Sequence, residues 1–411
     1  MVQQRLNLKL RSCTLAETVT NIEELLIEIL LRVPAIPLLR FKCVSKRWLS
    51  LISDPKFCHR HTLQNPHSSI SAVFSHNSTN FSIIPFPRSN YSSGIYHANH
   101  SHNSASWNPL DVIANQYGCI EIRDSCNGLF LCSPVGAPSS CRSPYFILNP
   151  TSSQFLTLTV PPCPAIGAGE LGEAAYIIGL FLAFDPSRSP HYKVICLNTI
   201  KDVPDCYHFQ LQIYSSETRS WRLLNSTFRI NFRLDYQRAV YWNGAIHWVG
   251  TFCEMSYYHI DEEHVKFVRG VPHCYEMKWF QTESRYFKES TSGCHLHLID
   301  IFGPMAWLSF TKFQVLEMPR DYSGWYVKYN VDLDPLCTSF PHIRCGMFVV
   351  LYLDRDENEE EDSSSLLLHS PGQVISCNLK SKTFESFNLA TCQGLLVKDD
   401  NYLFKETLAC V

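Results

Sequence analysis

The sequence lacks the signals of several common protein classes. Its 18 cysteines include no Cys-x-x-Cys spacing, which argues against the usual zinc and dithiol motifs. Its first residues are polar where a secretory signal would need an apolar run. We therefore expect reduced cysteines and a protein of the cytoplasm, the nucleus or both.

Long apolar runs are also missing. The longest, Ala174 to Phe184, is much shorter than the roughly 20 residues that a membrane-spanning helix needs. It suits a buried strand, and we expect no membrane partner.

Motifs for chemistry are scarce as well, since neither H-E-x-x-H nor G-x-S-x-G occurs. Residues 167–172 match G-x-G-x-x-G, but they follow three prolines and precede a β-like run, whereas a nucleotide site needs a strand before and a helix after. His97, His100 and His102 cluster without a cysteine or carboxylate at ligand spacing. We expect no catalytic residue, no metal and no cofactor.

The composition is that of a folded protein. Of 411 residues, 45% are apolar and 18% charged, with 19 Tyr, 25 Phe and 8 Trp, and such aromatic richness favours β-structure. This length predicts two unequal domains.

Charge divides the chain in the same way. Residues 1–62 hold 10 Lys and Arg against 5 Asp and Glu, which leaves 35 − 10 = 25 against 38 − 5 = 33 for the remainder. A basic head on a mildly acidic body suits docking on an acidic protein better than binding to nucleic acid.

Residues 20–62 show three short helical patterns. Thr20 or Asn21 can cap the first, in which Leu25, Leu26, Ile29 and Leu30 recur at helical spacing. Pro37 suits the start of a second helix ending at Phe41, and residues 44–52 suit a third, after which Asp54 and Pro55 punctuate the chain. So small a unit needs a partner surface, which could be another protein or the rest of this chain.

Residues 63–110 are rich in Ser, Asn, His and Pro and contain two β-like runs, 71–74 and 81–84. Beyond them, β-like segments follow one another without a long amphipathic helix. These segments are 145–148, 176–184, 192–197, 209–214, 239–248, 347–353 and 374–379.

Turn motifs indicate repeated hairpins. Asn127-Gly128 and Asn243-Gly244 are typical of two-residue hairpin turns. A strand, a polar turn and an aromatic residue recur at 149–155, 214–221 and 377–384. At about 40 to 50 residues per four-stranded blade, the second domain would hold six or seven propeller blades. The predicted fold class is α+β by segregation, a small three-helix unit followed by a large all-β domain, either a kelch-like β-propeller or a β-sandwich.

Residues 23–34 (EELLIEILLRVP) and 38–52 (LLRFKCVSKRWLSLI) strongly resemble the F-box, and 53–57 (SDPKF) resemble its usual continuation in a large plant group. Residues 182–186 (LAFDP), 191–194 (HYKV), 213–218 (IYSSET) with Trp221, and 242–248 (WNGAIHW) are similar to the F-box-associated domain of that group. Composition, local pattern and this resemblance together divide the chain into a disordered tail (1–19), an F-box (20–62), a loop-rich segment (63–110) and a β-domain (111–411).

This resemblance implies a substrate receptor of an SCF-type (Skp-cullin-F-box) ubiquitin ligase. The F-box would bind a Skp-type adaptor and through it a cullin scaffold, and the β-domain would bind an unidentified protein target. Matched by motif position, the expected adaptor-binding residues, some of which will only pack the interior, are Leu25, Leu26, Ile29, Leu30, Pro34, Leu39, Val44, Lys46 and Trp48.

One departure from the family pattern keeps other readings open. The first F-box helix usually opens with Leu-Pro, but this chain has Asn21-Ile22, and loss of that proline would weaken adaptor contact. The alternatives are a binding protein with a decayed F-box and, by analogy of architecture alone, a propeller-type enzyme or lectin.

Overall fold

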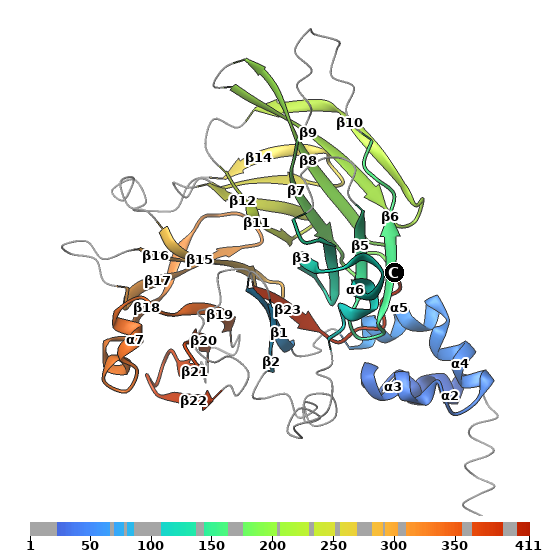
Figure 1. Ribbon diagram of the computed structural model, residues 1–411, viewed down its shortest axis with the longest axis horizontal. Coiled ribbons are helices and arrows are strands. Elements are labelled where there is room, and N and C mark those ends of the chain that lie inside the picture. Colours follow the sequence, from blue (N-terminus) through green and yellow to red (C-terminus); the bar gives the residue numbers. More distant parts are fainter. Residues whose placement is uncertain are drawn as a thin grey trace, which may run out of the picture.

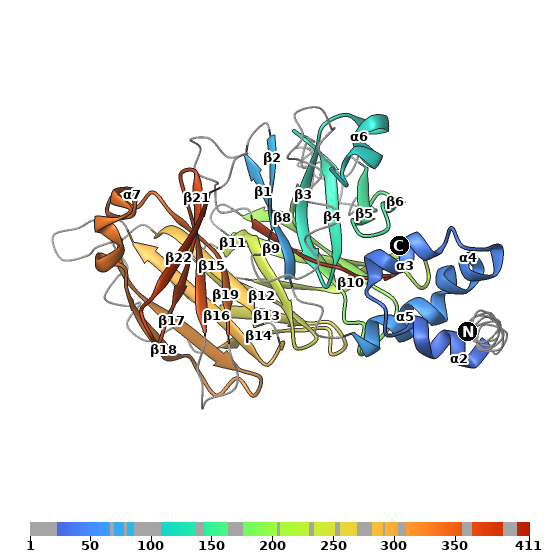
Figure 2. The same cartoon turned by 90° about the horizontal axis from the view of Figure 1, so that it is seen from below.

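The computed structural model of the chain shows a small group of helices beside a ring of six β-sheets (Figure 1, Figure 2). The residues it describes are 23–65, 70–77, 80–85, 108–136, 144–162, 176–203, 206–229, 234–250, 255–268, 282–290, 292–302, 310–355, 364–388 and 401–411.

From residue 23 onward, where the description of the chain begins, the helical unit contains four helices: α2 (Glu23–Leu30), α3 (Ala35–Phe41), α4 (Lys46–Ser53) and α5 (Pro55–Gln64). Ser45 caps α4, since its hydroxyl accepts the Trp48 N–H at 3.2 Å. Asp54 caps α5 through the Lys56 N–H at 2.8 Å, and proline suits the first helical position. Asp54 and Pro55 therefore begin a fourth helix that the sequence analysis did not anticipate. The expected caps Thr20 and Asn21 lie outside the described residues.

Five of the sheets are four-stranded antiparallel meanders, each a propeller blade. Their strands are β3 (Ile120–Cys126), β4 (Leu129–Pro134), β5 (Tyr145–Asn149) and β6 (Gln154–Leu158); β7 (Tyr176–Ala183), β8 (Lys193–Val203), β9 (Cys206–Ser215) and β10 (Ser220–Arg229); β11 (Leu234–Trp242), β12 (Ala245–Gly250), β13 (Met255–His259) and β14 (His264–Val268); β15 (Thr282–Glu289), β16 (His295–Phe302), β17 (Lys312–Pro319) and β18 (Tyr326–Asp332); β19 (Val349–Asp354), β20 (Ser365–Ser370), β21 (Gln373–Asn378) and β22 (Phe384–Asn388). Among the described residues, three short helical segments accompany them: α6 (Asp111–Tyr117), η3 (Asp334–Thr338) and α7 (Pro341–Arg344).

The sixth blade joins the two ends of the chain. Its order is β2-β1-β23, with β1 (Ile70–Asn77), β2 (Asn80–Pro85) and β23 (Asn401–Lys405), and β1 pairs with β23 through Val73 and Leu403. The ring thus closes non-covalently, which confirms the propeller and gives it six blades. The segment 63–110, expected to be loop-rich, contributes two strands to this closure.

The predicted hairpin turns are confirmed. Asn127 (φ 44°) and Gly128 (φ 88°) join β3 to β4, and Asn243 (φ 50°) and Gly244 (φ 78°) join β11 to β12. Such turns need positive φ at both central residues, which Asn and Gly tolerate best. The expected run 239–248 is therefore two strands around one turn.

The recurring polar turns are the last turns of three blades, β5–β6, β9–β10 and β21–β22. Each has one residue with positive φ: Ser153 (54°), Arg219 (53°) or Lys382 (56°). The weak repeat seen in the sequence is thus the outer hairpin of a blade.

The two ends of the ring differ. Successive turns of an antiparallel sheet alternate between its ends, and the first and third turns lie at the helical unit, where His59 Nε2 on α5 lies 2.9 Å from the Pro186 carbonyl oxygen of the β7–β8 connection. Residues 333–348, the described connection between β18 and β19, lie at the opposite end.

We predict that Gly128→Ala destabilises the protein more than Gly372→Ala. Both glycines have positive φ, but a Cβ on Gly128 would lie 2.6 Å from the Lys405 carbonyl oxygen and 2.5 Å from Thr407 Cγ2, whereas one on Gly372 meets nothing within 4 Å. Backbone strain alone should cost about 1 kcal/mol, and the clash about 1 to 3 kcal/mol more. Urea unfolding followed by tryptophan fluorescence measures both, and equal losses would contradict the close approach.

Candidate functional site

The helical unit has its own core. Leu26, Leu30 and Leu38 are at most 2% exposed and pack with Ile52, Phe57 and other apolar residues. The ninth buried member, Leu408 (5% exposed), comes from the carboxy-terminal tail, residues 406–411. The propeller chain therefore helps to fill the interior of the helical unit.

Large apolar side chains nevertheless remain exposed on this unit. Leu25 and Ile29, one helical turn apart on α2, are 46% and 50% exposed, Val44 is 60% exposed and Leu49 on α4 is 48% exposed. An ion pair between Glu23 and Arg47 at 3.7 Å brings the start of α2 to the start of α4. We call these four apolar residues the exposed set; they suit a protein partner.

The nine expected contact residues fall into three groups. Leu26 and Leu30 lie in the core, so they shape the surface and do not offer it. Leu25, Ile29, Val44 and Lys46 are exposed, and Pro34, Leu39 and Trp48 are half-buried.

Trp48, one of the half-buried residues, contacts the interior and also reaches the surface. Its ring meets that of Phe41 edge-on, with centroids 5.7 Å apart. Leu49, its neighbour in sequence, is an exposed candidate that motif matching missed, because only the burial pattern singles it out.

The tail fixes the helical unit to the propeller. Asn149, fully buried at the end of β5, donates through Nδ2 to the carbonyl oxygens of Thr407 (3.1 Å) and Ala409 (2.8 Å). The Thr407 N–H donates to the Thr151 hydroxyl at 3.1 Å. Together with the His59 contact to Pro186, these bonds make the two domains one packed body.

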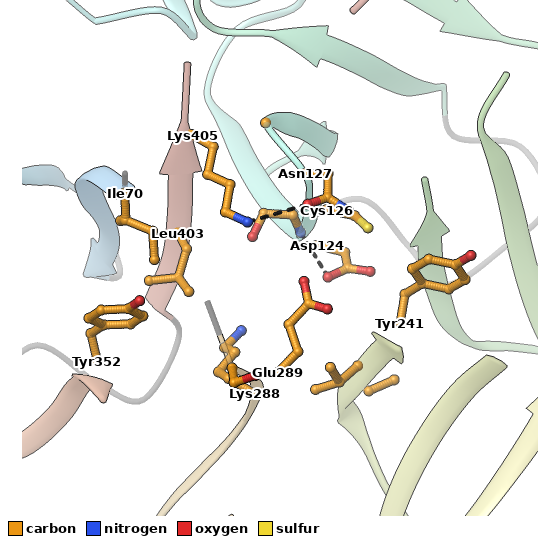
Figure 3. Close-up of a pocket in the computed structure, with 15 residues that line it drawn as sticks. Ile70, Asp124, Cys126, Asn127, Tyr241, Lys288, Glu289, Tyr352, Leu403 and Lys405 are labelled. Carbon is orange, nitrogen blue, oxygen red and sulfur yellow. Dashed lines mark hydrogen bonds between the residues drawn. The ribbon is translucent and has the colours of Figure 1, made fainter. Parts of the chain in front are cut away.

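The central channel of the ring holds a small charged pocket of about 50 Å³ (Figure 3). Asp124 and Glu289, from β3 and β15, point into the same space, and Lys405 approaches from β23. Its ammonium lies 3.5 Å from Asn127 Oδ1. The volume is far below the roughly 300 to 1,000 Å³ of small-molecule sites, so we assign the pocket to holding the ring together.

The channel carboxylates titrate unusually. Burial raises the pKa of Asp124 to about 6, although backbone N–H donors and Lys288 favour its ionised form. Its Oδ2 accepts the Leu182 N–H at 2.7 Å, which ties β3 to β7. Burial also raises the pKa of Glu289.

A third carboxylate, Glu317, lies between blades and is fully buried. Burial would raise the pKa of Glu317, but hydrogen bonds from His297, Tyr326 and Arg355 outweigh it and hold that pKa well below its usual range. The Arg355 Nε–Oε2 distance is 3.1 Å, and Arg355 follows β19 of the next blade. The hydrogen-bonding neighbours all stabilise the ionised carboxylate of Glu317. This indicates a residue that links two blades and not one that acts as a general acid or base.

Within the described ranges, no three His, Cys, Asp or Glu side chains could hold a metal ion together. In that same part of the chain, no helix has the length and apolarity to cross a membrane. His97, His100, His102 and the 167–172 motif lie outside the described residues.

Two family models match the chain. One described as "F-box domain" matches residues 23–60, and one described as "F-box associated beta propeller domain" matches residues 78–267.

Curated Arabidopsis thaliana proteins are similar. "F-box protein At5g07610" is 32% identical over 91% of this chain and 87% of its own length. "Putative F-box protein At1g47790" is 28% identical over 57% and 55%, and "Putative F-box/kelch-repeat protein At1g15680" is 27% identical over 56% and 52%.

We expect Asn149→Ala to loosen the helical unit and Asn378→Ala not to. Both side chains accept backbone N–H groups in equivalent outer turns, at 2.9 Å from Thr151 and 2.8 Å from Ser381. Only Asn149 also binds the tail, so its loss should cost about 2 to 4 kcal/mol against about 1 kcal/mol for Asn378. Chemical unfolding gives the energies. Limited proteolysis of the helical unit should accelerate only in Asn149→Ala, and equal rates would refute the tail's role.

The raised pKa of Asp124 predicts a pH dependence. Between its ordinary pKa of 3.8 and about 6, the folded chain keeps a proton that the unfolded chain loses, so this group's contribution to the free energy of unfolding falls as pH rises. Relative to Asp124→Asn, the parent should lose stability across this window. Urea midpoints of both proteins from pH 4 to 7 test this, and a constant difference would contradict it.

Proposed function

Because the chain belongs to the F-box proteins that carry an F-box-associated β-propeller domain, we propose that it is the substrate-recognition subunit of an SCF-type ubiquitin ligase. In this proposal the helical unit is the F-box and binds a Skp-type adaptor, which links it to a cullin scaffold. The propeller binds a protein target for ubiquitination, in the cytoplasm or the nucleus.

The observation that carries this proposal is the exposed set on a unit whose core is already full. From sequence, the apolar surface of these helices could serve either the interior or an interface. Leu408 enters the core, yet Leu25, Ile29, Val44 and Leu49 remain largely exposed. Apolar groups left exposed after the rest of the chain has packed favour a partner protein.

The target is best accommodated at the end of the propeller that faces away from the F-box. Residues 333–348, which connect β18 to β19, lie there, and loops on a rigid scaffold are where binding residues concentrate. A target held there would be carried with the F-box as one body, so this chain contributes proximity and orientation and leaves catalysis to other subunits.

The test is co-purification of the full chain with Skp-type adaptors. Ile29→Asp should reduce adaptor affinity by at least about tenfold, since it places a charge in an apolar interface. The matched control is Phe267→Asp on β14, where the side chain is 59% exposed on the propeller, and it should bind like the parent.

Variants of the core need separate treatment. Leu30 is 1% exposed, so Leu30→Ala should lower the free energy of unfolding of the F-box by about 2 to 5 kcal/mol. Loss of binding in this variant would therefore not report on the interface. Unchanged binding by a folded Ile29→Asp variant would reject the proposed surface. Failure of the parent to bind any of several adaptors would favour a non-ligase binding protein, consistent with Asn21-Ile22 in place of Leu-Pro.

A further inference from the structure

Two cysteines from opposite ends of the chain meet where the F-box joins the propeller. Cys58 lies on α5 and is 5% exposed. Cys410, the penultimate residue, is exposed. Both cysteines line one cavity, and each thiol shifts the pKa of the other, so the tail's sulfur lies beside an F-box helix. The Cys58 thiol donates its own hydrogen to the Ile52 carbonyl oxygen at 3.4 Å.

A cavity of about 360 Å³ opens beside this pair. Its lining comes from α5, the β7–β8 connection, the β9–β10 turn and the tail. Lys56, His59 and Arg219 are among the lining residues. Small solutes can thus reach the exposed sulfur from solvent.

The two thiols differ in acidity. Interaction with Cys58 lowers the pKa of Cys410 to about 7, against burial and with help from Lys42; Asp54 opposes the shift. Interaction with Cys410, followed by burial, raises the pKa of Cys58. Cys58 therefore keeps its proton, and Cys410 is the nucleophilic thiolate.

We propose that Cys410 and Cys58 form an oxidisable pair that a hydroperoxide converts into a disulfide between the tail and the F-box. The thiolate of Cys410 attacks the peroxide, the O–O bond breaks, and Cys410 becomes a sulfenic acid as the departing oxygen takes up a proton to leave as water. The Cys58 thiol then attacks the sulfenic sulfur, a second water leaves, and the S–S bond forms. Two thiols are oxidised by two electrons and one hydrogen peroxide is reduced to two waters.

The disulfide would make covalent a junction that is otherwise held by Leu408 and by the bonds to Asn149. It would fix the direction of the F-box relative to the propeller, and it would close nearly the whole chain into one loop. A cross-link of this kind stabilises a folded state by restricting the unfolded chain.

The experiment uses the full chain without any adaptor, so its result is independent of the proposed function. After a titration with hydrogen peroxide, free thiols are blocked with N-ethylmaleimide and the digested protein is mapped by mass spectrometry. The parent should yield a peptide pair joined through Cys58 and Cys410, and on a non-reducing gel it should migrate faster, with reversal by dithiothreitol.

Single variants assign the roles. Cys410→Ser should abolish the faster band. Cys58→Ser should abolish it too, while leaving a sulfenic acid on Cys410 that dimedone traps. Cys43→Ser, which removes an exposed F-box cysteine, is the matched control and should behave like the parent.

Alkylation rates supply a second readout that does not need the disulfide. In the parent, Cys410 should react with iodoacetamide half-maximally near pH 7, and in Cys58→Ala the midpoint should move upward because the interaction with the Cys58 thiol is lost. The proposal is overturned if Cys58 and Cys410 stay separately alkylated at peroxide doses that oxidise Cys43, or if Cys58→Ala leaves the midpoint of Cys410 unchanged.

Discussion

The packing of the last eleven residues against both domains is the interaction on which the rest of the structure depends. Residues 401–405 form β23, which pairs with β1 and closes the ring. The next residues leave the ring, receive two hydrogen bonds from Asn149 and place Leu408 among the F-box helices. One short segment thereby supplies the closing strand of a propeller and part of the core of a separate helical unit.

This arrangement decides how the two domains can move. A flexible linker would let the F-box sample many directions relative to the ring. Here α5 also contacts the β7–β8 connection, and the tail packs beside it. The direction in which the F-box presents Leu25 and Ile29 is therefore a property of the fold and not of a tether.

Much of this structure follows from local sequence patterns, and the remainder depends on contacts between distant residues. Asn127-Gly128 and Asn243-Gly244 require positive φ, so each turn could be placed from two residues. The outer hairpins followed from a recurring strand, polar turn and aromatic residue, and the propeller from the length of that repeat. The sequence did not separate the propeller from a β-sandwich, or six blades from seven, because ring closure depends on pairing between β1 and β23. The fourth helix was not anticipated because Asp54-Pro55 can both end one helix and begin another.

The candidate site was only partly predictable. Helical spacing selects Leu25, Leu26, Ile29 and Leu30 equally, and only the packed structure separates the buried pair from the exposed pair. No local sequence pattern marks Leu408 or Cys410. Their roles depend on contact with F-box helices from which the whole propeller separates them in the sequence. No pattern within a short window can report such a contact.

The place of Leu408 has a consequence for biosynthesis. The helices of the F-box leave the ribosome before the propeller, but one of their core residues follows the whole propeller in the sequence. A chain that is cut before β23 lacks both this residue and the strand that closes the ring. The F-box thus reaches its full packing only after the propeller and Leu408 have been synthesised, and chains terminated before that point carry an incompletely packed docking domain.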